Sequence, residues 1–174
     1  MQYRMLFAAA LILAGCRSSD EPATGPVTSA AATARAEFRD PSGQPLPIEQ
    51  LERARNATAR YHDVEKAVAD GYVDINVVRP NMGRHFLNDS LLDGKFEPEH
   101  PELLVYSPDA NGKLQLVAVE YAVPLAASAD APEGFEGSAD TWVPDVQFPL
   151  WTLHAWVWSP NPAGIFSPMN SRVP

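Results

Sequence analysis

Three side chains that could take part in chemistry lie in segments that are otherwise mostly apolar: His85, Glu120 and His154. We therefore expect all three to be buried. A buried carboxylate must be paired, hydrogen-bonded or held neutral. Two imidazoles and a carboxylate are also suitable ligands for Zn²⁺, Cu²⁺ or Fe²⁺. If neighbouring strands carry these residues, the sequence predicts a possible site for a divalent transition metal.

Two residues near the N-terminal side of the domain, His62 and Glu65, are further candidate ligands. They are three residues apart in a predicted helix, so both project from one flank. The same spacing is common for a partly exposed pair on a helix surface. No motif with two closely spaced histidines supports the metal interpretation.

Two other interpretations of the buried polar residues remain open. In the first, His85 and His154 form hydrogen bonds with Glu120 or with the backbone, in a network that fixes the core. In the second, Glu120 and His154 orient a small ligand in an aromatic pocket that includes Tyr121, Trp156 and Trp158.

The overall composition excludes several classes of function. The net charge of the 174-residue chain is −9, so the basic surface of a nucleic-acid-binding protein is absent. No Gly-x-Ser-x-Gly motif and no glycine-rich phosphate loop occurs. The sequence indicates no reaction, and it favours a non-enzymatic binding, structural or accessory role.

The N-terminal residues 1–15 have the layout of a secretory signal peptide: Arg4 precedes an apolar run, and small residues end it. The last of these residues, with the one cysteine of the chain, form the sequence Leu13-Ala14-Gly15-Cys16. This sequence resembles the lipobox of bacterial lipoproteins. The resemblance implies that residues 1–15 are removed and that the Cys16 thiol is acylated, which also excludes it as a catalytic nucleophile and as a disulfide partner.

The acylated Cys16 would anchor the protein in a membrane, because two or more acyl chains bind a bilayer stably. Arg17 follows Cys16, where an inner-membrane lipoprotein often has Asp. In a Gram-negative cell we therefore expect an outer-membrane protein that faces the periplasm, with a small ligand or an envelope protein as a possible partner. Residues 16–45 are rich in Ser, Ala, Thr, Pro and Gly, which predicts a flexible tether.

A single α+β domain is predicted for residues 46–174. Apolar residues spaced three and four apart predict one long helix over residues 47–70, which Gly71 ends. Alternating apolar residues then predict four or five antiparallel strands, including 72–78, 84–88, 102–107, 114–124 and 150–158. The Asn111-Gly112 pair predicts a hairpin between the third of these segments and the central strand 114–124. We expect the helix to pack on a curved sheet.

The central strand contains the residue that breaks its pattern. We expect Leu114, Leu116, Ala118 and Ala122 on one face of strand 114–124, with Val117, Val119, Tyr121 and Val123 on the other. Glu120 shares the first of these faces.

Several segments together resemble a family of uncharacterised secreted bacterial proteins. They are ARYHDVEKA (59–67), MGRHFLN (82–88), PELLVY (101–106), VAVEY (117–121), LHAWVW (153–158) and NPAG (161–164). The resemblance would cover roughly residues 54–173 and implies one intact domain. It implies no catalytic residue.

Overall fold

A computed structural model describes residues 39–174 of the chain. The predicted signal peptide, Cys16 and the tether up to residue 38 lie outside the described residues. The helical elements are α2 (Ile48–Thr58), η1 (Ala59–His62), α3 (Val64–Ala69) and η2 (Asp89–Leu91). The strands are β1 (Val73–Arg79), β2 (Gly83–Leu87), β3 (Leu103–Pro108), β4 (Leu114–Pro124), β5 (Val143–Asp145) and β6 (Leu150–Ala155).

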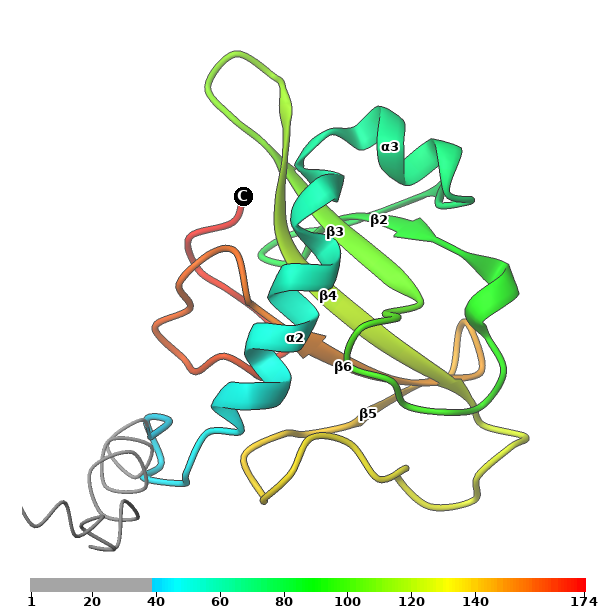
Figure 1. Ribbon diagram of the computed structural model, residues 1–174, viewed down its shortest axis with the longest axis vertical. Coiled ribbons are helices and arrows are strands. Elements are labelled where there is room, and N and C mark those ends of the chain that lie inside the picture. The colour runs from blue at the N-terminus through cyan, green and yellow to red at the C-terminus, as the bar shows by residue number, and fades with distance from the viewer. Residues whose placement is uncertain (1–38) are drawn as a thin grey trace, which may run out of the picture.

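All six strands form one antiparallel sheet in the order β1-β2-β3-β4-β6-β5. The sheet is curled, so that its two edge strands approach each other: Arg79 of β1 forms an ion pair with Asp145 of β5 at 2.9 Å. The concave face of this half-barrel therefore lies under the ion pair. Helix α2 packs on the opposite face (Figure 1), where Leu51 contacts a core that includes Tyr106 and Tyr121.

The predicted fold class, one long helix packed on four or five strands, is wrong. The structure has no long helix in residues 39–174, and its sheet has six strands. The α-helix α2 ends at Thr58, and the 3₁₀ turn η1 follows it directly. Asp63, whose backbone is extended, then separates η1 from the short helix α3. In a continuous helix the Tyr61 carbonyl would accept from the Glu65 N–H. Here the Tyr106 hydroxyl donates to the Tyr61 carbonyl, and the Asp63 carboxylate accepts from the Glu65 N–H.

The sixth strand is β5, which the sequence does not reveal. It has three residues, and Pro144 at its centre lacks the N–H that a strand uses for pairing. Such a strand is tolerated at a sheet edge, and among the described strands β5 pairs with β6 alone. The final predicted strand is also too long, because β6 ends at Ala155 instead of residue 158.

A bulge in the central strand changes which side chains share a face. Val105 of β3 is paired with Ala118, but Tyr106 is paired with Leu116, so β4 has one extra residue at Val117. Leu116 therefore joins the core under α2, together with Val119. The prediction that Leu116 and Glu120 share a face is wrong, because strict alternation does not continue through a bulge.

The bounds of β4 and the hairpin that joins it to β3 are confirmed. Pro108 pairs with Leu114, and the Asp109 carboxylate accepts from the N–H groups of Asn111 and Lys113 within the turn. At the end of the chain, residues 156–174 pack against the sheet, where Asn170 N–H donates to the Asn81 carbonyl. None of the helices in residues 39–174 has the length and apolar character needed to cross a bilayer.

Candidate metal centre

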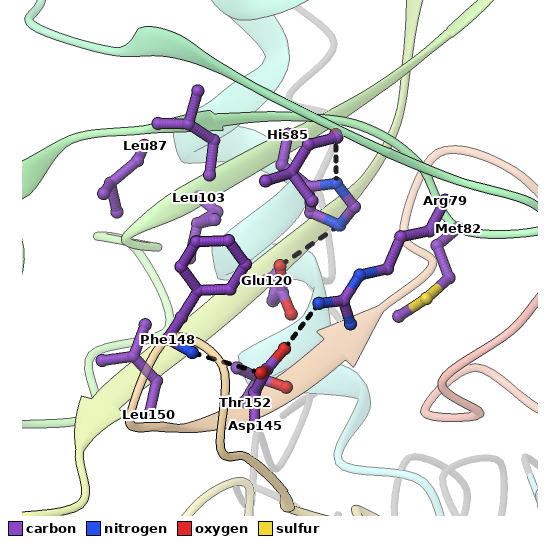
Figure 2. A pocket seen from close by; sticks show the side chains of 12 residues that line it. Arg79, Met82, His85, Leu87, Leu103, Glu120, Asp145, Phe148, Leu150 and Thr152 are labelled. Atoms are coloured by element: carbon purple, nitrogen blue, oxygen red, sulfur yellow. Dashed lines mark hydrogen bonds and ion pairs between the residues drawn. The ribbon is translucent and has the colours of Figure 1, made fainter.

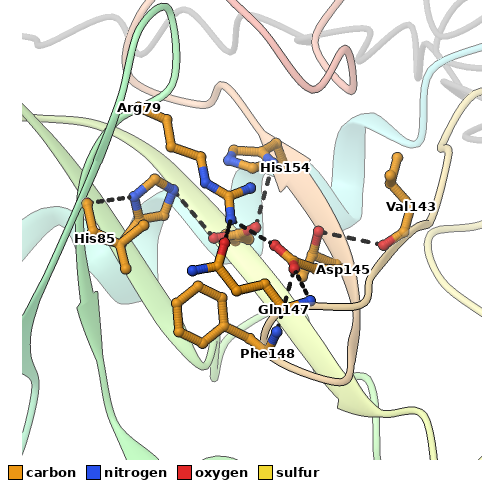
Figure 3. A network of polar contacts seen from close by, with 10 residues as sticks. Arg79, His85, Val143, Asp145, Gln147, Phe148 and His154 are labelled. Atoms are coloured by element: carbon orange, nitrogen blue, oxygen red, sulfur yellow. Dashed lines mark hydrogen bonds and ion pairs between the residues drawn. The ribbon is translucent and has the colours of Figure 1, made fainter.

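The sheet brings His85, Glu120 and His154 together on its concave face. Figure 2 shows Glu120 beside His85, and Figure 3 shows His85 and His154 on the same face. Glu120 of β4 lies directly opposite His154 of β6 in the strand register. His85 lies on β2, two strands from β4, and β3 connects them because it pairs with both strands. The curl of the sheet shortens the distance across β3, so three residues from three strands meet at one point.

The three side chains form a compact and buried group. His85 Nε2 lies 3.5 Å from Glu120 Oε2, and His154 Nδ1 lies 3.5 Å from Glu120 Oε1. One ligand atom from each residue can be chosen so that all three atoms lie within 4.8 Å of one another. The residues are only 3%, 5% and 3% exposed, in chain order. The group could therefore hold a metal ion.

The hydrogen-bond partner of His85 determines which of its nitrogens can bind a metal. His85 Nδ1 lies 3.0 Å from the Val77 carbonyl oxygen, which can only accept, so Nδ1 carries the hydrogen. In the neutral ring Nε2 then has a free lone pair, and this lone pair faces Glu120. A backbone carbonyl that orients an imidazole in this way is a common feature of metal sites.

His154 is also suited to act as a neutral ligand. Burial lowers the pKa of His154; Glu120 opposes this shift, and His85 and Arg79 add to it. The ring stacks on Trp156 at a centroid distance of 5.9 Å. Its Nδ1 faces Glu120, whereas its Nε2 is buried and has no hydrogen-bond partner among the described residues.

The distances between donor atoms are compatible with a small coordination sphere. In a tetrahedral zinc site with bonds of ~2.1 Å, neighbouring ligand atoms are ~3.4 Å apart. The two nitrogen–oxygen distances of 3.5 Å are close to this value. Both exceed the usual length of a hydrogen bond between an imidazole and a carboxylate. The two distances are therefore compatible with a small cation held by the three side chains.

A pocket opens beside the candidate ligands (Figure 2). Its walls are mostly apolar and include Ile75, Leu87, Leu103, Phe148 and Leu150, while His85 and Glu120 contribute polar groups. Arg79 and Asp145 form the ion pair at its side. The sequence analysis singled out neither residue, because only the curl of the sheet brings the two edge strands together.

The structure places the other candidate ligands elsewhere. His62 and Glu65 are exposed, and His62 contacts the ring of Trp158 at a centroid distance of 4.3 Å. Neither belongs to the group formed by the three buried residues. They belong to the helical elements η1 and α3, whose Tyr61 and Val64 pack against the core on the opposite face of the sheet.

The three aromatic residues of the predicted ligand pocket do not line one common pocket with Glu120. The Tyr121 hydroxyl donates to the Pro98 carbonyl in the core under α2. Trp156 Nε1 donates to the Ser167 carbonyl, and Trp158 Nε1 donates to Thr58 Oγ1. None of the three lines the pocket beside Glu120.

Sequence reasoning missed a second buried carboxyl group, that of Glu102. It is 2% exposed and accepts from the Ala122 N–H, just beyond the point where β3 and β4 stop pairing. Burial raises the pKa of Glu102 to about 8, although the bond from Ala122 opposes the shift. The position of Glu102 at the start of a strand, next to Pro101, gives no sign of this environment.

Comparisons of the chain with protein-family models, with curated protein sequences and with solved structures found no match. The functional argument therefore depends on the geometry of the site.

Proposed function

We propose that this protein binds a divalent transition metal through His85, Glu120 and His154. The observation that carries the proposal is the arrangement around Glu120, in which both imidazoles face the carboxylate at 3.5 Å. The hydrogen on His85 Nδ1 is donated to Val77, so a metal ion that displaces any proton from Nε2 finds the Nε2 lone pair and the Glu120 carboxylate on the same side.

The donor set favours Zn²⁺, Cu²⁺ or Fe²⁺ over Mg²⁺ or Ca²⁺. Imidazole nitrogen is a good ligand for the first three ions, whereas Mg²⁺ and Ca²⁺ prefer oxygen ligands. Three protein ligands leave at least one coordination position for water or another small molecule. The proposal is one of metal binding, and it assigns no reaction to the site.

Metal analysis of the purified full chain tests the proposal. After treatment with a chelator and then with Zn²⁺, the protein should retain about one equivalent of zinc after desalting. Its thermal unfolding should shift upward, because a ligand at 100 times its dissociation constant stabilises the folded state by about 2.7 kcal/mol. Mg²⁺ at the same concentration should have no effect.

Protein that retains no zinc and whose unfolding temperature is unchanged by Zn²⁺ and Cu²⁺ would contradict the proposal. In that case the three side chains form a structural polar network.

We further propose that the metal-binding domain is held at the cell envelope by acyl chains on Cys16. The support for this is the lipobox sequence in residues 13–16. When bacteria are grown with radioactive palmitate, the wild-type protein should become labelled. On cell fractionation it should be found in the membrane fraction. The Cys16→Ser variant should lose both properties, and a labelled Cys16→Ser protein would refute acylation at this residue.

A further inference from the structure

Two hollows meet at the Arg79–Asp145 ion pair. The first, which we call the inner pocket, is the apolar pocket beside His85 and Glu120. The second, which we call the outer groove, is lined by the segment 143–147 and by His154. Both are bordered by Arg79, Met82, Asp145 and Thr152, so the two hollows adjoin at the ion pair, and we call them together the depression.

Arg79 is the one cationic side chain that borders this depression among the described residues. Its Nη2 donates to Asp145 at 2.9 Å and makes a longer contact of 3.5 Å with Gln147 Oε1. Its Nε and Nη1 have no hydrogen-bond acceptor among the described residues, although the guanidinium has five N–H groups. Arg79 can therefore bind another planar anion in the fork-like geometry that suits carboxylates.

Polar donors and apolar surface occur together around Arg79. His154, whose buried Nε2 lacks a partner, lines the outer groove and lies beside Arg79 in Figure 3. Val143, Val146 and Phe148 lie along the rim and are 37%, 87% and 37% exposed. Large apolar side chains that gather at the mouth of a depression are typical of a binding surface.

We propose that this depression binds a small amphipathic carboxylic acid. The carboxylate pairs with the Arg79 guanidinium, and the hydrocarbon part covers the apolar surface near Val146 and Phe148. Asp145 is the internal competitor, since it occupies one edge of the guanidinium. The inference goes beyond metal binding and does not depend on it, because Arg79 is not one of the proposed metal ligands.

Calorimetric titration of the metal-free full chain with octanoate tests this inference, with octan-1-ol as a neutral ligand of similar length. Octanoate should bind at least 10-fold more tightly than octan-1-ol, because only the acid pairs with the guanidinium. Arg79→Gln should weaken octanoate binding at least 10-fold and leave octan-1-ol binding unchanged. Asp145→Asn should strengthen octanoate binding by removing the competing carboxylate.

The matched control is Arg84→Gln. Arg84 also forms an ion pair with an aspartate, Asp74, and its side chain is 38% exposed against 36% for Arg79, but Arg84 borders neither hollow. Arg84→Gln should therefore bind octanoate as the wild type does. Equal binding of acid and alcohol, or equal losses in the two arginine variants, would overturn the inference. If Arg79→Gln does not fold, an Asp145→Asn variant without tighter octanoate binding overturns it as well.

Zinc binding measured on the same preparations separates this inference from the proposed metal site. Zinc binding without octanoate binding would support the proposed metal site and contradict the inference about Arg79. Octanoate binding without zinc binding would contradict only the proposed metal site.

Discussion

Glu120→Gln is expected to weaken zinc binding at least 100-fold and to leave the metal-free protein folded. The change removes the one anionic ligand of the site and keeps the shape of the side chain. A 100-fold loss corresponds to about 2.8 kcal/mol of binding free energy. Thermal unfolding with and without Zn²⁺ measures it: the wild type should be stabilised by the metal, and the variant should not.

The stability of the metal-free Glu120→Gln variant distinguishes a metal site from a structural network. In the wild type His85 Nε2 lies 3.5 Å from a carboxylate oxygen of Glu120. A glutamine amide can turn either its NH₂ group or its carbonyl oxygen toward this nitrogen and form a hydrogen bond with it. We therefore expect the metal-free variant to be at least as stable as the metal-free wild type. A network in which Glu120 is the essential acceptor requires the opposite, since breaking a buried pair is destabilising.

His100→Ala is the matched control for this experiment. His100 Nδ1 lies 3.3 Å from Glu97 Oε2, so this pair also joins an imidazole to a carboxylate. The two side chains are 62% and 57% exposed, and no third ligand within residues 39–174 completes the pair. His100→Ala should retain the zinc stoichiometry of the wild type. If it loses zinc as Glu120→Gln does, the retained metal is bound at the surface.

The candidate ligands could be predicted from sequence because each one breaks a local apolar pattern. Glu120 interrupts a strand whose neighbours are apolar on both faces, and this is visible without a structure. Their meeting point could not be read in the same way. It depends on the register that places Glu120 opposite His154, and on the curl that brings β2 close to them.

The errors in the predicted fold come from contacts that are distant in the sequence. The prediction of a long helix is wrong because the Tyr61 carbonyl accepts a hydrogen bond from the Tyr106 hydroxyl, 45 residues away, instead of from the next helical turn. The predicted faces of β4 fail at Val117, where a bulge against β3 adds one residue. The pairing of Arg79 with Asp145 joins the two ends of the sheet across 66 residues. Local periodicity contains no information about any of these contacts.

Glu102→Gln is expected to remove a large pH dependence from the stability of the protein. Burial raises the pKa of Glu102 to about 8 in the folded state, above its ordinary value of 4.5. The folded state therefore holds this proton more tightly than the unfolded chain does. The resulting stabilisation is complete below pH 4.5 and is lost as the pH rises toward and through 8. At about 1.4 kcal/mol per pKa unit, a shift from 4.5 to about 8 corresponds to a loss of about 5 kcal/mol.

In Glu102→Gln the amide oxygen can still accept from the Ala122 N–H, and no proton is released. The free energy of unfolding, measured with urea between pH 5 and pH 9, should therefore fall for the wild type relative to the variant, which becomes the more stable protein at the alkaline end.

Carboxylates with a lowered pKa, such as Asp74 beside Arg84, lose their stabilisation only at acid pH. The lowered pKa of His154 makes stability rise with pH in the acid part of this window, but it acts on both proteins, so the difference between the two profiles reports Glu102. Glu52→Gln, a change at an exposed position of α2, should follow the wild-type profile. Parallel profiles for Glu102→Gln and the wild type would show that Glu102 is already ionised in the folded protein at neutral pH.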